Sequence, residues 1–158
     1  MLLVFSFPDP VNEKAARTVA AVVALTALVA LLTGWYWLTL PLAYGFWARV
    51  LTGPTLSPLG RGAQRFASSY LGEPHHVPGP PKRFAQGMGA AMTTGAVIAW
   101  LLGADTLVAV LLAMLLLAAT LESVFAYCLG CKVFAGLMRI GLIPEAVCEK
   151  CVVGGADL

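Results

Sequence analysis

Residues 106–127 read TLVAVLLAMLLLAATLESVFAY and contain one carboxylate, Glu122, and no lysine or arginine. At a rise of about 1.5 Å per residue, a helix over these positions is about 33 Å long, which matches a hydrocarbon core of about 30 Å. Three similar apolar stretches precede it, at residues 15–32, 35–51 and 84–102. We therefore predict an all-α integral membrane protein, in which residues 1–158 form a single domain folded as a bundle of four spans.

The composition agrees with this class of protein. Hydrophobic residues make up 59% of the 158 residues and charged residues only 11%, and the mean hydropathy is +0.85. A soluble domain of this length does not need so much apolar material to fill its core. The first apolar stretch lacks a signal-peptidase cleavage site and is followed at once by the second, so we expect it to remain as a span.

The ten lysines and arginines gather near one end of the predicted bundle. They lie at residues 14–17, 49–83 and 132–150, and none lies in the hairpins at 33–34 and 103–105. The positive-inside rule therefore predicts a multi-pass protein of the inner (cytoplasmic) membrane. Both termini and the long loop between the second and third spans are expected in the cytoplasm.

The long loop carries a helical signal of its own. Ser57 followed by Pro58 is typical of a helix start, and apolar residues then recur at helical spacing opposite Arg61 and Arg65. We expect an amphipathic helix lying on the inner leaflet. His75 and His76 follow in a proline-rich segment, where we expect solvated side chains rather than ligands of a metal or a lipid headgroup.

All four cysteines follow the last span, as two Cys-x-x-Cys pairs: Cys128 with Cys131, and Cys148 with Cys151. We expect the helix of the last span to continue through the first pair, and a short helix beginning near Pro144 to carry the second. Residues three apart on a helix share a face, and the 16 intervening residues let the chain fold back. The sequence thus predicts a helical cytoplasmic tail, residues 128–158, that can bring four sulfurs together.

That arrangement is compatible with two kinds of chemistry. The pairs could exchange disulfides or carry a persulfide, because a helix N-terminus and nearby cations lower the pKa of a thiol. Cys148, close to Lys150, fits the attacking thiol best, and Cys151 would resolve the mixed intermediate. Cys128 and Cys131 would then form a second thiol pair in the same exchange. Alternatively, the four thiolates could form a tetrahedral zinc site with a structural role. A permanent disulfide is not expected on the reducing cytoplasmic side.

Glu122 is a further candidate, because an ionisable group inside a span is often functional. On a straight helix it lies about 120° around the axis from Cys128, so we do not expect the two to act together directly. Transport of a small sulfur compound would need a polar path through the spans, for which Glu122 and a few Ser and Thr residues are available. Phosphate-binding loops, nucleophile elbows and basic nucleic-acid patches are lacking, so nucleotide enzymes, classical hydrolases and nucleic-acid binding are not expected.

Five pieces of the chain resemble a family of bacterial membrane proteins catalogued as domain of unknown function number forty-three ninety-five. The pieces are residues 7–17 (FPDPVNEKAAR), 57–59 (SPL), 77–86 (VPGPPKRFAQ), 128–131 (CLGC) and 148–151 (CEKC). Members of that family look like neighbours or fusion partners of thioredoxin-like and sulfurtransferase proteins. The resemblance implies thiol or sulfur metabolism, and it suggests that the segments around Asn12 and Lys82–Arg83 are more than loops. From their place in the predicted topology we expect them to dock on the inner face of the bundle beside the cysteines.

Together these features predict a membrane protein that handles disulfides or sulfane sulfur, as an oxidoreductase or a relay component, with a soluble thioredoxin-like or sulfurtransferase partner. Two alternatives remain open. One is a non-catalytic membrane module with a structural four-cysteine zinc site, and the other is a transporter of a small sulfur compound.

Overall fold

The computed structural model describes residues 7 and 9–148, and these residues form a helical protein. The predicted all-α class is confirmed. The α-helices are α1 (Glu13–Thr33), α2 (Thr39–Thr52), α3 (Pro58–Tyr70), α4 (Gly79–Leu101), α5 (Asp105–Phe125) and α6 (Leu129–Arg139). Two 3-10 turns, η2 (Tyr36–Leu38) and η3 (Glu145–Val147), and two short strands, β1 (Val11–Asn12) and β2 (His76–Val77), complete the described part.

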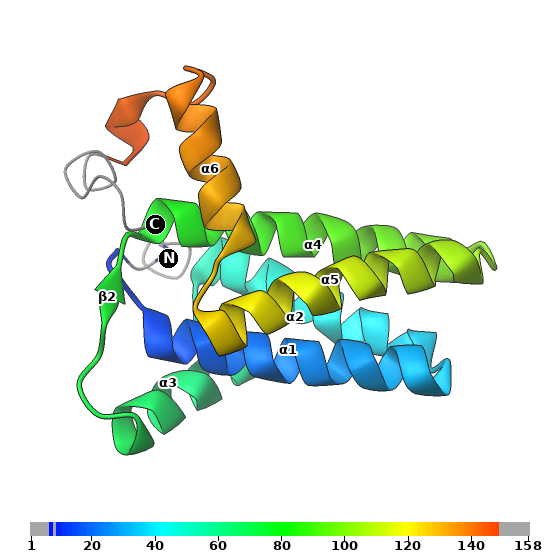
Figure 1. Ribbon diagram of the computed structural model, residues 1–158. Coiled ribbons are helices and arrows are strands. Elements are labelled where there is room, and N and C mark those ends of the chain that lie inside the picture. Colours follow the sequence, from blue (N-terminus) through cyan, green and yellow to red (C-terminus); the bar gives the residue numbers. More distant parts are fainter. Residues whose placement is uncertain (1–6, 8, 149–158) are drawn as a thin grey trace.

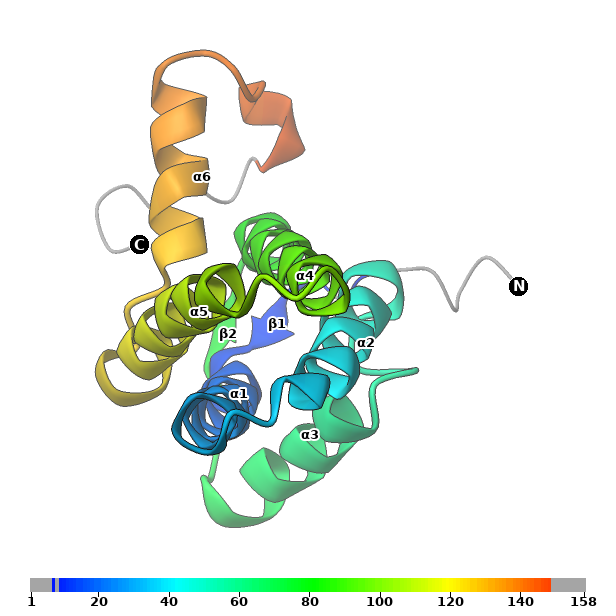
Figure 2. The same ribbon diagram turned by 90° about the vertical axis from the view of Figure 1, so that its right-hand side faces the viewer.

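Helices α1, α2, α4 and α5 lie alongside one another as a four-helix bundle (Figure 1, Figure 2). Helix α1 packs against α5, α2 against α4, and α4 against α5. Small side chains fill much of the interior, where Ala27, Ala30 and Ala90 are at most 1% exposed. Small residues let helix backbones approach closely, which is a common way of packing helices in membranes.

Two helices of the described part, α1 and α5, are long and apolar enough to cross a membrane. Their most apolar windows have mean hydropathies of 2.2 and 2.4, yet only 33% and 22% of those windows are buried in the protein. Large apolar side chains therefore point outward, as Leu32 and Leu117 do at 78% and 60% exposure. Both helices therefore expose a large apolar surface, of the kind that marks contact with a membrane or with another protein.

The second predicted span begins later than expected. Residues 36–38 form η2 instead of helix, and α2 begins at Thr39, whose hydroxyl donates to the carbonyl of Tyr36 at 2.7 Å. With 14 residues, α2 is about 21 Å long, which is shorter than the hydrocarbon core.

One end of the bundle carries the two strands, α3 and α6, and the opposite end carries the tight hairpins (Figure 1). Glycines with positive φ, Gly34 at 71° and Gly103 at 72°, follow α1 and α4 at those hairpins. At the end that carries the strands, α3 and α6, the Arg17 guanidinium donates two hydrogen bonds to the carbonyl of Ser123, at 3.0 and 3.2 Å. Arg83 donates to the carbonyl of Val50 at 3.0 Å. These cations satisfy the last carbonyls of α5 and α2, where the helix dipole is negative.

The helix predicted in the long loop is present as α3. The Ser57 hydroxyl accepts a hydrogen bond from the Gly60 amide at 3.1 Å, which is the expected N-cap. Its small residues Ala63 and Ala67 are buried, and α3 packs on α1. The aromatic Phe66 on the same helix remains 47% exposed, so the predicted apolar face divides into a packed part and an open part.

The proline-rich segment pairs with the start of the chain. Val77 lies opposite Val11, and His76 opposite Asn12, in the antiparallel β1–β2 ladder. His75 contacts Glu13 with 2.5 Å between Nδ1 and Oε2, although its own side chain is 69% exposed. The segment therefore ties the beginning of α1 to the beginning of α4.

Candidate functional site

The chain turns sharply between the last bundle helix and the first cysteine pair. Helix α5 ends at Phe125, because Ala126 adopts a left-handed conformation with φ of 54°. The prediction of one helix running through Cys128 is therefore wrong. Glycine or asparagine is the usual residue where a helix ends in this conformation, and alanine rarely adopts it. The break at Ala126 therefore has no signal in the sequence.

Cys128 is the N-cap of the new helix α6. Its backbone is extended, and its Sγ accepts a hydrogen bond from the Cys131 amide at 3.3 Å. Cys131 lies in the first turn of α6, and both residues are free thiols, 8% and 5% exposed. The first sulfur thus lies at the positive end of the helix dipole, where a thiolate is favoured.

Close contact with α4 fixes the position of this helix start. A Cβ on Gly130 would lie 2.5 Å from the Cα and Cβ of Ala85. The ring of Phe134, one turn further on, lies 5.7 Å from the ring of Phe84 between centroids. The glycine inside the Cys-x-x-Cys pair therefore lets α6 begin directly against α4.

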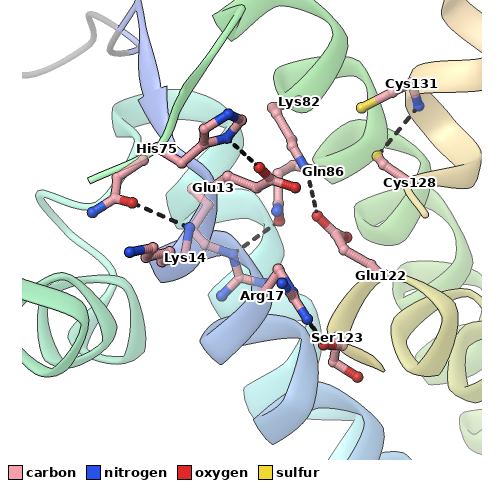
Figure 3. Close-up of polar contacts among 12 residues, drawn as sticks. Glu13, Lys14, Arg17, His75, Lys82, Gln86, Glu122, Ser123, Cys128 and Cys131 are labelled. Carbon is pink, nitrogen blue, oxygen red and sulfur yellow. Dashed lines mark hydrogen bonds and ion pairs between the residues drawn. The ribbon is translucent and has the colours of Figure 1, made fainter. Parts of the chain in front are cut away.

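An ion pair lies beside the cysteines (Figure 3). Lys82 Nζ on α4 and Glu122 Oε1 on α5 are 2.7 Å apart, and their side chains are only 8% and 16% exposed. The straight-helix geometry that put Glu122 about 120° around the axis from Cys128 does not apply, because the chain turns at Ala126. Both residues line one cavity. Lys82 lies beside the cysteines, as expected from the predicted topology.

The surroundings shift the pKa values of the two thiols in opposite directions. A hydrogen bond from the Cys131 thiol lowers the pKa of Cys128, and the positive charge of Lys82 and the Cys131 amide add to this effect, against burial and the charge of Glu122. The same sulfur–sulfur hydrogen bond raises the pKa of Cys131, and burial and the charge of Cys128 raise it further. Cys128 is therefore suited to act as the nucleophile, while Cys131 keeps its proton.

The cavity beside Cys128 has a volume of about 160 Å³. Its polar lining comes from Cys128, Glu122 and Gln86, all near the end of the bundle that carries α6. Apolar residues of α1, α2, α4 and α5 line the remainder: Val19, Val23, Phe46, Met88, Met92, Met114 and Leu115. An apolar pocket with a few convergent polar groups and a perturbed thiol is a reasonable binding site.

Arg49 and Gln86 belong to this polar region, although the sequence did not single them out. Arg49 is 6% exposed, and its Nε donates to Gln86 Oε1 at 2.9 Å. The guanidinium carbon lies 4.6 Å from the centroid of the Phe46 ring. Among the described residues, neither terminal nitrogen of Arg49 has a hydrogen-bond partner. An arginine near the end of an apolar stretch is the available signal in the sequence.

The second cysteine pair is described only in part. Cys148 is 5% exposed and is the residue directly after η3, so it does not lie within a helix as predicted. Cys151 lies outside the described residues. Within residues 7 and 9–148, no group of three or more His, Cys, Asp or Glu side chains is placed to hold a metal. The four-cysteine zinc site remains a prediction, because it requires Cys151.

The comparisons with known proteins give one match. No curated protein and no solved structure matches the chain. A family model described as "Domain of unknown function (DUF4395)" matches residues 11–139. The matched segment contains the whole bundle, α6, Cys128 and Cys131, and it ends before Cys148. Because this match covers most of the 158 residues, the chain belongs to the DUF4395 family.

Proposed function

We propose that this protein is a multi-pass membrane thiol protein that exchanges disulfides or sulfane sulfur through the Cys128–Cys131 pair. The observation that carries the proposal is the asymmetry of the pair. Cys128 caps a helix N-terminus and accepts a hydrogen bond from the Cys131 amide, beside the buried Lys82. Its lowered pKa makes it the attacking thiol.

The membrane part of the proposal rests on the surface of the bundle. Helices α1 and α5 present large apolar side chains outward over spans of membrane length. We infer that α2 and α4 complete a four-span bundle, in which η2 extends the reach of the short α2. The basic residues cluster at the end that carries α3 and α6, so we place this end and both termini in the cytoplasm. The exposed aromatic side chains of α3 would then lie against the inner leaflet.

The exchange proceeds in two steps. The Cys128 thiolate attacks one sulfur of a partner's disulfide, which forms a mixed disulfide and releases the other partner sulfur as a thiolate. Cys131 gives up its proton to that leaving thiolate and attacks Cys128 Sγ. The Cys128–Cys131 bond forms while the mixed-disulfide bond breaks. The second partner sulfur leaves as a thiolate and takes a proton from water, so the partner is released as a dithiol with two more electrons. The steps are reversible, so the same pair can accept electrons from a partner dithiol.

The sulfane-sulfur version uses the same nucleophile. Cys128 attacks the outer sulfur of a partner persulfide, the sulfur–sulfur bond of the partner breaks, and the partner cysteine leaves as a thiolate. The outer sulfur remains on Cys128, which becomes the persulfide. A thioredoxin-like or sulfurtransferase protein is the proposed partner for either reaction. The exposed apolar residues Val133, Ile140, Leu142 and Val147, on and after α6, offer an apolar surface for such a protein.

Trapping of the mixed disulfide tests the proposal. In Cys131→Ser, Cys128 can attack but nothing resolves the intermediate, so a covalent complex with an oxidised thioredoxin-like protein should accumulate on non-reducing gels. Cys128→Ser is the matched control and should trap at least tenfold less. Equal trapping by both variants would overturn the assignment of Cys128, and trapping that depends on Cys148 would restore the assignment made from the sequence.

A further inference from the structure

The cavity beside Cys128 lies inside the bundle and is mostly apolar. A volume of about 160 Å³ matches that of apolar cavities that hold a single benzene ring, about 150 Å³. A folded protein cannot enter a space of this size. Any molecule that meets Cys128 in this cavity must therefore be small or must insert only one ring.

The cavity also reaches the outer surface of the bundle. Two of its lining residues, Met88 on α4 and Met114 on α5, are 36% and 55% exposed. The surrounding surface of α5 is apolar, with Val110 and Leu117 at 50% and 60% exposure. In a membrane these side chains face lipid, so a ligand would enter from the bilayer and not from water.

The polar end of the cavity is lined by Gln86, Glu122 and Cys128. The Oε1 atom of Gln86 already accepts a hydrogen bond from Arg49, which leaves the Gln86 amide nitrogen as a donor. Lys82 does not line the cavity, but it pairs with Glu122, which does. An apolar ring that carries carbonyl groups matches both the walls and this end of the cavity.

We infer that this cavity binds the head group of a membrane-soluble quinone, which accepts the electrons of the Cys128–Cys131 dithiol. The inference rests on the proposed function, since it names the electron acceptor of the same pair. Oxidation of a dithiol releases two electrons and two protons, which is the quantity that converts a quinone into a quinol. Electrons would thus flow from a soluble partner dithiol to the cysteine pair and then to the quinone.

The dithiol is oxidised by the quinone in two steps. The Cys128 thiolate adds to the quinone ring, and one ring oxygen takes a proton from solvent. Cys131 transfers its proton to the second ring oxygen and attacks Cys128 Sγ. The sulfur–sulfur bond forms while the carbon–sulfur bond breaks, and the electron pair of that bond remains on the ring. The products are one disulfide and one quinol.

The test uses the full chain, reduced and freed of reductant in detergent, with decylubiquinone as the probe. Loss of quinone absorbance should accompany loss of two thiols per quinone in the wild type, and Cys128→Ser should be inactive. Ala118→Phe fills the cavity from a partly buried position and should raise the KM for the quinone at least tenfold. Ala113→Phe, exposed on the same helix, is the matched control and should leave the KM unchanged.

A second assay separates this inference from the proposed function. Wild-type protein and Ala113→Phe should react with a water-soluble aromatic disulfide through Cys128 at the same rate. Wild-type protein that reacts with this disulfide but not with decylubiquinone would overturn the quinone site and leave the proposed function standing. Failure of both reactions would overturn both.

A third measurement needs no variant in the cavity. Decylubiquinol, the redox product, should slow the alkylation of Cys128 by iodoacetamide at least fivefold in the wild type. Unchanged alkylation at saturating quinol would contradict the site even if Ala118→Phe failed to fold.

Discussion

Replacement of Gly130 by alanine should release the start of α6 from the bundle. The new Cβ would lie 2.5 Å from the Cα and Cβ of Ala85. The shortest ordinary contact is 3.4 Å, so α6 and α4 must separate locally by at least about 0.9 Å. The obstructing atoms include backbone, which cannot rotate away. Overpacking of this kind costs about 1–3 kcal/mol.

The separation should also change the chemistry of the pair. Cys128 caps α6, so a shift of the helix start carries its sulfur away from Lys82 and weakens an interaction that lowers the pKa of this thiol. We expect Gly130→Ala to unfold at a lower temperature than the wild type. Tryptophan fluorescence of the protein in detergent measures this temperature. The pH at which iodoacetamide alkylation of Cys128 is half-maximal should rise in the same variant.

Gly136→Ala is the matched control for this experiment. It lies in the same helix, and a Cβ there would meet no atom within 4 Å. Alanine at an open helical position stabilises by about 0.5–1 kcal/mol relative to glycine. If Gly130→Ala proved as stable as Gly136→Ala and left the alkylation profile unchanged, the close packing of α6 on α4 would be refuted.

Three further predictions concern the charges around the pair. Lys82→Met should raise the pKa of Cys128 and Glu122→Gln should lower it, because the two charges act on this thiol in opposite directions; alkylation rates measured against pH would contradict this if both variants shifted the profile the same way. The pKa of Cys131 is raised in the folded protein, so as the pH rises this thiol ionises first in the unfolded chain. Its contribution to the free energy of unfolding is complete below the pKa of an unfolded cysteine and is lost as the pH rises above that value. Cys131→Ser should therefore lessen the alkaline loss of thermal stability, and an unchanged pH slope would count against the buried, protonated thiol. Arg17→Met removes charged donors from the last carbonyls of α5 and should lower the free energy of unfolding by about 1–3 kcal/mol, which a denaturant titration in detergent can measure.

The cysteine pair lies at one end of the bundle, next to the cavity. Apolar residues of the bundle helices line most of the cavity, and its polar lining includes Cys128. Helix α6 leaves the bundle at the end that carries the strands and α3 (Figure 1). The fold thus places Cys128 between the apolar interior of the bundle and this end.

Several elements of the fold were predictable because their signals are local. The apolar stretches, the Ser57–Pro58 helix start and the glycine hairpins each depend on residues within one or two turns of each other. The family resemblance further drew attention to Lys82. The start of α2 and the end of α5 were predicted wrongly, since a 3-10 turn at Tyr36–Leu38 and a left-handed Ala126 have no distinctive sequence pattern.

The sequence by itself determined that the protein is helical and apolar, that its cations gather at one end, and that its thiols occur in two pairs. Only the tertiary structure decided which thiol is acidic and what surrounds it. Lys82 and Glu122 are 40 residues apart and meet because α4 packs on α5. The pKa of Cys128 depends first on the hydrogen bond from Cys131, and then on burial and on that charge pair. Contacts of this kind are set by packing between distant segments, and no local pattern of residues encodes them.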